Sequence, residues 1–228
     1  MSYLYETHMH TSEVSLCGRS TADEMIKSYK EKGFSGVVVT DHFITGNSSC
    51  PRDIPWKEKM LYIKKGYDQA AISGQKYDIS VFFAWEYAVN GDDLLTYGLD
   101  IDFLFEYPQI HFCDIETYCD IVHKAGGYII HAHPYRIADY IPKAPSPRAD
   151  LIDAVEVYNS SHHHYENDFD EKALEFALKY NLTQTAGSDA HIANFPMVGI
   201  EFNKKAKDIN DLINMIKSRS GKLMTVPK

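Results

Sequence analysis

The sequence predicts an α/β fold whose mainly parallel sheet closes, or nearly closes, into a barrel. Short apolar runs rich in β-branched residues alternate with helical stretches along the chain, and strand–helix units of this length imply helical crossovers between parallel strands. No glycine-rich phosphate loop follows the first strand, which argues against a doubly wound sheet. Polar residues instead follow many different strands, as at the open end of a barrel. No repeat or linker divides the chain, so we expect one domain over residues 1–228.

Local patterns place the individual elements. The first helix, over 21–32, has Ser20 or Thr21 as its N-cap, acidic residues in its first turn and Gly33 after its end. The run GVVVT at 36–40 is predicted to be a buried strand because of its β-branched residues. The last helix, over 208–218, gathers its apolar residues on one face. Further helices are expected at 57–75, 114–125 and 169–180, and further strands at 3–10, 79–86, 128–132, 153–157, 182–186, near 197–202 and at the C-terminal end.

Composition argues against several classes of function. The chain has 228 residues and a formal net charge of −9, whereas sequence-independent binding to long nucleic acid needs an excess of Lys and Arg. The longest apolar runs are too short to span a bilayer, and the first residues lack the pattern of a signal peptide. The four cysteines form no CxxC pair, so reduced thiols and a cytoplasmic location are expected. The oligomeric state stays open.

Histidines and carboxylates gather at the ends of the predicted strands. His8 and His10 are one residue apart on a strand, so both side chains project from the same face. Four other groups each follow a different strand: Asp41-His42, Glu86, His131 with His133, and Asp189 with His191. The carboxyl ends of parallel barrel strands open onto one face, so five strands bring imidazoles and carboxylates into a common space.

This joint pattern predicts metal binding. A lone histidine at a strand end is more often a hydrogen-bonded structural residue, and that interpretation is preferred for His111 and His123. Burying so many ionisable groups together without a cation would leave unpaired charges and desolvated imidazoles. Mixed imidazole and carboxylate ligands suit Zn²⁺, Mn²⁺ or Fe²⁺ better than Mg²⁺ or Ca²⁺. The candidate ligands exceed the capacity of one ion, so we expect two or three divalent ions, with Glu86 as a possible bridge.

Six strings, in this order, resemble the PHP (polymerase and histidinol phosphatase) superfamily of metal-dependent phosphoesterases. They are ETHMHTSEVSLCGR, GVVVTDHF, FFAWEYAV, HAHPYR, AVEVYNS and TAGSDAH, and they extend from residue 6 to residue 191. The set is much more specific than an HxH pair alone. The resemblance implies a distorted seven-stranded (β/α)7 barrel, similar to a TIM barrel, with a trinuclear metal site.

The same resemblance implies a role for each ligand. His8, His10, Glu86 and Asp189 look like ligands of a first metal. Glu86 looks like the bridge to a second metal that also takes His133. By the same resemblance, His42 and His191 look like ligands of a third metal.

Two stretches depart from the family pattern. Many members carry an Asp or His a few residues after HxH, where this chain offers Glu13, Cys17 and Arg19; Glu13 is the expected ligand. Members also tend to supply a His between the motif Glu and the HP motif, where this chain has Asp92 and Asp93; Asp93 is the expected ligand. An oxygen ligand there would favour a harder ion such as Mn²⁺ or Fe²⁺, whereas a vacated position would leave two metals.

The expected chemistry is attack on a small phosphate monoester by a hydroxide that bridges two metals. A sugar, nucleotide or histidinol phosphate is the kind of substrate considered. Asp189 or His191 is expected to protonate the leaving alkoxide. Arg136 in HPYR is the first candidate to hold the substrate phosphate, and Arg19 is the second.

Three further groups are expected near the substrate. His131 is expected to support a ligand or contact the substrate. Asn159 follows a strand and is expected to orient a ligand or cap the turn. The run 162–164 of three histidines is expected in a surface loop at the mouth of the barrel.

Three alternatives stay open. One is a nuclease or polymerase-associated proofreading activity, against which the acidic charge balance counts. A second is an inert or regulatory metal-binding barrel, because function depends on the site and not on the fold. A third is an amidohydrolase acting on a C–N bond, which the lack of an obvious bridging lysine on a middle strand weakens.

Overall fold

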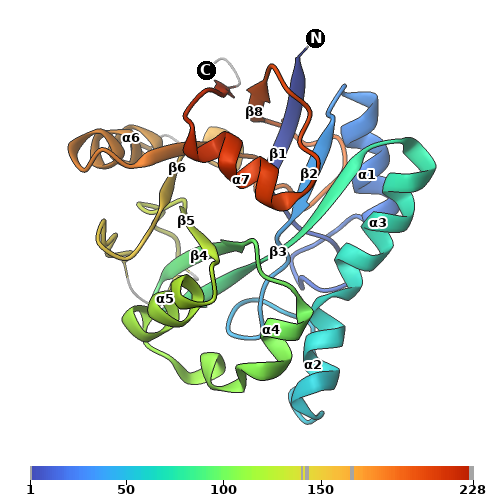
Figure 1. Cartoon of the computed structure of the whole chain (residues 1–228), viewed down its shortest axis with the longest axis vertical. Helices are drawn as coiled ribbons and strands as arrows, with labels where there is room; N and C mark the ends of the chain where they lie inside the picture. Colours follow the sequence, from blue (N-terminus) through green and yellow to red (C-terminus); the bar gives the residue numbers. More distant parts are fainter. Residues whose placement is uncertain (1, 140, 142–143, 165–166, 226–228) are drawn as a thin grey trace.

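One continuous sheet organises the molecule. The computed structural model describes residues 2–139, 141, 144–164 and 167–225, and within this part nine strands form a sheet in the order β7-β6-β5-β4-β3-β2-β1-β8-β9 (Figure 1). The strands are β1 (Tyr3–Met9), β2 (Gly36–Val39), β3 (Ser80–Val89), β4 (Asp92–Tyr97), β5 (Tyr128–Ala132), β6 (Ala154–Asn159), β7 (Thr183–Gly187), β8 (Gly199–Phe202) and β9 (Lys222–Met224). The α-helices are α1 (Ala22–Glu31), α2 (Trp56–Ile63), α3 (Lys65–Tyr77), α4 (Ile101–Glu106), α5 (Ile115–Lys124), α6 (Phe169–Lys179) and α7 (Ile209–Lys217), and short 3₁₀ helices are η1 (Pro108–Phe112) and η2 (Ser160–His164).

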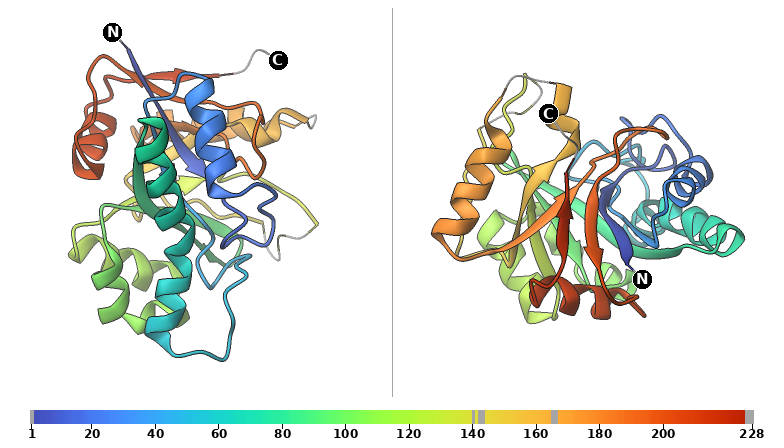
Figure 2. Two further views of the ribbon diagram at one scale, coloured as in Figure 1. Left: turned by 90° about the vertical axis from the view of Figure 1, so that its right-hand side faces the viewer. Right: turned by 90° about the horizontal axis from the view of Figure 1, so that it is seen from above.

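The sheet curves until its two sides meet, which gives the nearly closed barrel that the sequence predicts. β1, β2 and β3 run parallel, and so do β5, β6 and β7. The residues just after β7 then pair with β1: Asp189 N donates to His8 O (2.8 Å) and His10 N donates to Ala190 O (3.0 Å). Seen from above, the strands surround a common interior (Figure 2). This closure brings the end of β7 beside the HxH pair.

The expectation of seven strands in a (β/α)7 barrel is wrong in its details. The sheet has nine strands in the described residues, and β4 runs antiparallel to both β3 and β5. β3 and β4 form a hairpin through Asn90 and Gly91, whose φ angles of 54° and 95° are those of a type I′ turn. A two-residue Asn-Gly turn matches the twist of the flanking strands, and it replaces the helical crossover that a strict (β/α) repeat requires here. β8 and β9 extend the sheet beyond β1 through antiparallel pairs.

The helices cover the outside of the sheet, while α7 closes one end of it. α1 and α3 lie side by side on one flank, and α6 packs against β6 on another (Figure 1). The apolar face of α7 packs with Tyr5, Tyr97 and Tyr128 in one buried cluster. These tyrosines stand at the amino end of β1, the carboxyl end of the antiparallel β4 and the amino end of β5. α7 therefore fills one end of the barrel. The other end, where the carboxyl ends of the parallel strands lie, is left open for a functional site.

Most predicted elements lie where the sequence indicates. Thr21 caps α1 as expected, and it forms a capping box with Glu24. The helix expected at 57–75 is two helices, α2 and α3, that meet at Lys64. Near this break Gly66 packs so closely that a Cβ atom would lie 2.0 Å from Asp41 Oδ2, so α3 approaches the strand end directly. Among the described residues, no helix has the length and apolar character needed to cross a membrane.

Candidate metal centre

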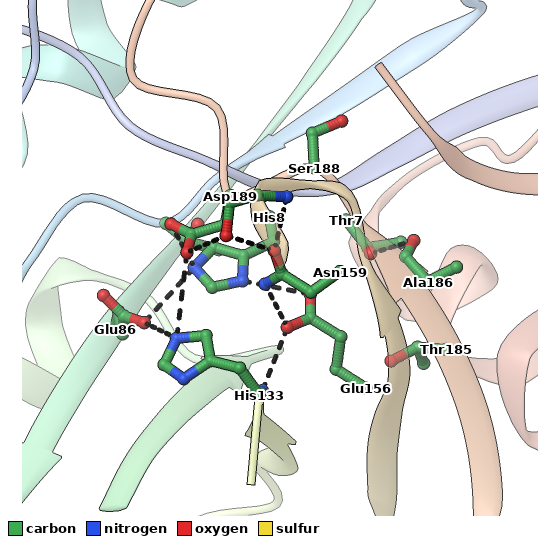
Figure 3. A network of polar contacts seen from close by, with 12 residues as sticks. Thr7, His8, Glu86, His133, Glu156, Asn159, Thr185, Ala186, Ser188 and Asp189 are labelled. Atoms are coloured by element: carbon green, nitrogen blue, oxygen red, sulfur yellow. Dashed lines mark hydrogen bonds and ion pairs between the residues drawn. The ribbon is translucent and has the colours of Figure 1, made fainter. Parts of the chain in front are cut away.

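The strand-end donors meet at the carboxyl ends of the parallel strands. The cluster contains His8 and His10 from β1, His42 after β2, Glu86 from β3, His133 after β5, and Asp189 and His191 after β7. Most of these side chains are buried, and His191, at 26% exposure, gives the cluster access to solvent. Figure 3 shows Glu86, His8, His133 and Asp189 pointing toward one another. The structure thus brings together seven of the residues expected to bind metal.

Glu86 lies at the centre of this cluster. Its Oε1 atom is 3.2 Å from both His8 Nε2 and His133 Nε2. Its Oε2 atom is 2.6 Å from His42 Nδ1 and 3.6 Å from His10 Nε2. The His42 and Glu86 atoms, although close, lack the geometry of a hydrogen bond. A carboxylate with histidine nitrogens around both oxygens suits a bridge between two cations.

Asp189 is the second carboxylate of the cluster. Its Oδ1 atom lies 3.2 Å from His10 Nε2 and 3.5 Å from His8 Nε2. Burial alone would raise the pKa of this carboxyl group, but the Arg136 guanidinium and the nearby imidazoles hold the pKa well below its usual range. Asp189 is therefore anionic at any pH near neutrality.

The hydrogen bonds around His10 show that these residues fit a cation. Ser15 Oγ donates to Asp41 Oδ1 (2.8 Å), so its oxygen accepts the proton of His10 Nδ1 (3.2 Å). Burial lowers the pKa of His10 well below 6.5, so the ring is neutral and its Nε2 atom carries a lone pair. That lone pair faces the Asp189 carboxylate and, at 3.2 Å, His8 Nε2. A divalent ion between these donors would satisfy all three.

The donors form three adjoining groups. They are His8–Glu86–His133, His8–His10–Asp189 and His10–His42–His191, and within each group the ligand atoms lie within 4.8 Å of one another. Neighbouring groups share His8 or His10. Ligand bonds of about 2.0–2.1 Å place donor atoms about 3.3 Å apart around a tetrahedral ion, close to the separations observed.

Glu156 holds two histidines of the cluster in place, and the sequence analysis did not identify it. It is buried in β6, where its Oε1 atom accepts from His8 Nδ1 (3.0 Å) and its Oε2 atom accepts from the His133 backbone N–H (3.0 Å). Asn159 Nδ2 also donates to Oε2 (2.8 Å), and these contacts are drawn in Figure 3. A carboxylate behind a ligand imidazole fixes the ring and directs its other nitrogen toward the metal. Asn159 therefore contacts Glu156 and not a histidine of the cluster, and its expected role in orienting a ligand stays a prediction.

Two further buried carboxylates hold the backbone around the cluster. Glu6 accepts from the backbone N–H groups of His8 and Ser188, both at 2.9 Å, and so joins β1 to the end of β7. Burial raises the pKa of Glu6 to about 7, although these hydrogen bonds oppose the shift. Asp41 accepts from Thr11 N (2.7 Å) and from Ser15 Oγ, and so fixes the loop after the HxH pair. The sequence analysis did not single out Glu6 or Glu156; a charged residue within an otherwise apolar strand is the feature that could have identified both.

Two residues of the cluster have a backbone conformation that residues other than glycine seldom adopt. His133 has φ 31° and Asp189 has φ 51°, both in the left-handed region. Such strain is held in place by the surrounding hydrogen bonds, and it concentrates at functional sites. The left-handed backbone conformation directs the side chains of His133 and Asp189 from the strand ends into the cluster.

The first departure from the family pattern now has a structural explanation. Glu13 does not join the cluster, because both of its carboxylate oxygens accept from Ala22 N at the start of α1 (3.0 and 3.1 Å). Cys17 lies there instead, with Sγ 3.2 Å from His42 Nε2. Burial would raise the pKa of the Cys17 thiol, but hydrogen bonds with His191 and His42 lower it to about 6. Arg19 has an exposed side chain, and its backbone N–H donates to His191 O (2.7 Å).

Asp93 lies at the edge of the cluster, at the start of the antiparallel β4. Its Oδ2 atom is 4.0 Å from His133 Nδ1. Burial, together with the Glu86 charge, raises the pKa of Asp93 to about 8.

His131 is not brought to the cluster. Ile130 and Ala132 point into the barrel, so the alternating His131 points to the other face of β5, where its Nε2 atom is 3.2 Å from Asp92 Oδ1.

Arg136 reaches the cluster from the loop after β5. Its Nη2 group donates to Asp189 Oδ2 (2.6 Å) and to Ser161 Oγ (2.7 Å). Its Nε group donates to His162 Nε2 (3.0 Å), while His162 Nδ1 donates to Asp170 Oδ1 (2.7 Å). His162 is buried, so the expectation of a surface loop is wrong for this residue; the neighbouring run 165–166 lies outside the described residues. The guanidinium is thus fixed beside the donor cluster.

Fold and site together define an α/β barrel with a histidine–carboxylate cluster suited to divalent metals. A family model described as PHP-associated matches residues 168–220. No curated protein matches the chain at a significant level. The matched segment includes α6, β7, β8 and α7, which is a minor part of the chain.

Three solved structures illustrate what this fold is similar to. A two-domain protein of Bacteroides vulgatus that contains a predicted PHP-like metal-dependent phosphoesterase matches with a TM-score of 0.72 and 13% identity, over 98% of this chain and 65% of that one. An amidohydrolase of Chromobacterium violaceum, with bound sulfate and no metal, matches with a TM-score of 0.58 and 15% identity, over 94% and 96%. The lesion-specific endonuclease EndoQ of Pyrococcus furiosus matches with a TM-score of 0.60 and 15% identity, over 98% and 58%. At such identities the likeness concerns the fold alone.

Proposed function

We propose that the protein is a metal-dependent phosphoesterase that hydrolyses a small phosphate monoester. The observation that carries this proposal is the Arg136 guanidinium, held 2.6 Å from Asp189 Oδ2 at the edge of the donor cluster. A fixed guanidinium beside sites for divalent cations forms a strongly cationic corner that suits a phosphoryl group. The net charge of −9 disfavours long nucleic acid as the usual substrate.

The proposed ligands are His8, His10, Glu86, His133 and Asp189 for two metals, with His42 and His191 at a third position. Zn²⁺, Mn²⁺ and Fe²⁺ suit this mixture of nitrogen and oxygen donors. Divalent ions bound there would supply Lewis-acid polarisation of the phosphoryl group and activation of water at neutral pH.

The residues of the chain perform the remaining tasks. Glu156 keeps the His8 ring turned so that Nε2 faces the cluster. Arg136 binds a phosphoryl oxygen at the cluster edge. His191 is the proposed donor of a proton to the leaving alkoxide, because it is the most exposed histidine of the cluster and its Nδ1 atom is already engaged by the Asp189 carbonyl (2.8 Å). Its Nε2 atom can donate this proton only while the third position holds no metal, because a nitrogen that binds metal carries no proton.

A substrate screen tests the proposal. The purified protein is analysed for metal and assayed on phosphate monoesters, phosphate diesters, short oligonucleotides and amide substrates with Mn²⁺, Zn²⁺ or Fe²⁺. We expect monoester turnover that is lost in His10→Ala and Asp189→Ala. Turnover of oligonucleotides or amides alone would instead support one of the other chemistries, and bound metal with no turnover would support an inert barrel.

A second measurement tests the role of Arg136. We expect Arg136→Ala to raise the KM for a phosphate monoester, because the fixed guanidinium is lost. Lys172→Ala is a matched control, since Lys172 forms an exposed ion pair with Asp168 on α6. An unchanged KM in Arg136→Ala would remove this residue from the binding site.

A further inference from the structure

The donor group formed by His10, His42 and His191 differs from the other two groups. Each of the others includes a carboxylate, Glu86 or Asp189, whereas this outer group contains histidines only. A divalent cation held by three neutral imidazoles keeps its full charge, and anionic ligands are what offset such charge in a buried site. The outer group therefore has no anionic member of its own, and the nearby Glu86 Oε2 approaches His42 at Nδ1 (2.6 Å) and not at Nε2.

Cys17 is placed to supply that donor. Its Sγ atom is 3.2 Å from His42 Nε2, and it also contacts His191. In a tetrahedral site, a sulfur at about 2.3 Å and a nitrogen at about 2.0–2.1 Å from a zinc ion lie about 3.5 Å apart. The observed separation differs from this value by a few tenths of an ångström, which a small rotation of the thiol side chain covers.

The backbone holds Cys17 between the two histidines. Leu16 N donates to Asn47 O (2.9 Å), which ties the loop to the segment that follows His42. On the other side, Arg19 N donates to His191 O (2.7 Å). Gly18 completes the loop, because a Cβ atom there would lie 2.5 Å from the Thr11 carbonyl oxygen. The thiol is thus fixed by contacts to both segments that carry the outer histidines.

The alternative anionic residue in this loop is already engaged. Glu13 accepts from the start of α1 through both carboxylate oxygens. The remaining cysteines lie elsewhere: Cys50 and Cys119 are buried in the apolar core, and Cys113 contacts Gln109 at the end of η1. Among the described residues, Cys17 is the one thiol in contact with the cluster.

We propose that Cys17, as a thiolate, ligates a divalent ion together with His42 and His191. This assignment rests on the proposed metal-dependent function and adds a soft donor to one position of the centre. Thiolate ligands select Zn²⁺ or Fe²⁺ over Mn²⁺ and Mg²⁺, so the outer position differs in metal preference from the two carboxylate-containing positions.

Cobalt substitution tests the assignment without relying on turnover. Co²⁺ bound by a thiolate gives an intense sulfur-to-metal charge-transfer absorption in the near ultraviolet, whereas Co²⁺ bound by nitrogen and oxygen alone gives only weak visible bands. We expect the Co²⁺-loaded protein to show the charge-transfer band, Cys17→Ser to lose it together with one equivalent of metal, and Cys113→Ser to keep both. Zinc should also protect Cys17 from alkylation by iodoacetamide.

The outcomes separate the two proposals. Visible cobalt bands without a charge-transfer band, or a charge-transfer band that survives in Cys17→Ser, would overturn the role of Cys17 and leave the metal centre intact. No cobalt bound at all would overturn the metal-dependent function as well. Because Cys17 is half-buried in a loop, thermal unfolding of Cys17→Ser and Cys17→Ala without metal shows whether both variants are folded.

Discussion

The contact between Glu156 and His8 gives the sharpest test of how the metal ligands are held. Glu156 Oε1 accepts from His8 Nδ1 at 3.0 Å, while Oε2 accepts from His133 N and Asn159 Nδ2. In Glu156→Gln the amide keeps one oxygen, so either His8 or the other two donors must face an NH₂ group. We therefore expect one charge-assisted hydrogen bond to be lost and the His8 ring to be less well fixed.

The magnitude follows from the bond that is removed. A hydrogen bond to a charged group contributes about 1.5–3 kcal/mol, which corresponds to roughly 10- to 150-fold in an equilibrium constant. Loss of a residue that orients a ligand typically weakens metal affinity by about 10- to 100-fold, in the same range. We expect Glu156→Gln to weaken the tightest metal site by about this factor and to lower kcat/KM in proportion when metal is limiting.

Metal competition with a chromophoric chelator measures the change. Glu201→Gln is the matched control, because Glu201 lies on β8 and pairs there with Leu4 and Lys222, so this change should leave the affinity unchanged. If Glu156→Gln is folded and binds metal within about threefold of the wild type, the hydrogen bond does not orient the ligand and the reasoning is refuted.

Two further substitutions test the supports of the site. A Cβ atom in Gly187→Ala would lie 2.4 Å from Glu156 Oε1 and 2.6 Å from His8 Cβ, so we expect a loss of about 1–3 kcal/mol in unfolding free energy and weaker metal binding; denaturant titration showing unchanged stability would contradict this. His162→Phe removes the acceptor for Arg136 Nε, so we expect a rise of about fivefold in the KM for a phosphate monoester with little change in metal affinity, and an unchanged KM would contradict it.

The sequence predicts which donor side chains lie together because of a simple geometric rule. Side chains at the carboxyl ends of parallel strands share one face of a barrel, whatever the exact strand count, so His8, Glu86 and Asp189 could be grouped without knowing the fold in detail. The hairpin at Asn90-Gly91 was missed, although an Asn-Gly pair between apolar runs is a strong hairpin pattern.

The supporting residues were harder to predict, because their roles depend on contacts across the sheet. Glu156 stands in the middle of a strand, and spacing alone indicates its face but not that His8 lies opposite it. The choice between Glu13 and Cys17 depends on the course of a loop, in which Glu13 turns back to cap α1. Such loop conformations depend on distant backbone contacts that residue order does not reveal.

The donor cluster also links metal binding to stability, and the size of this effect can be stated. An ion that binds only the native state stabilises it by about 2.7 kcal/mol at 100 times its Kd, which corresponds to a rise of about 5–10 °C in Tm for a domain of this length. We expect Zn²⁺ or Mn²⁺ to raise Tm by this amount, a chelator to reverse it, and His10→Ala to reduce the response.

The pH dependence of this stabilisation follows from His8. Burial would lower the pKa of its imidazole, but Glu156, Asp189 and Glu86 together raise it well above 6.5 in the metal-free protein. A group whose pKa is raised by folding stabilises the native state below its unfolded pKa, and this contribution is lost as the pH rises through the folded pKa. Protons therefore stabilise the metal-free form and compete with the metal for His8 Nε2, so the rise in Tm on adding metal should shrink as the pH falls toward 6.5. Differential scanning calorimetry with and without chelator measures both forms, and a metal response that grows on acidification would show that His8 is not a ligand.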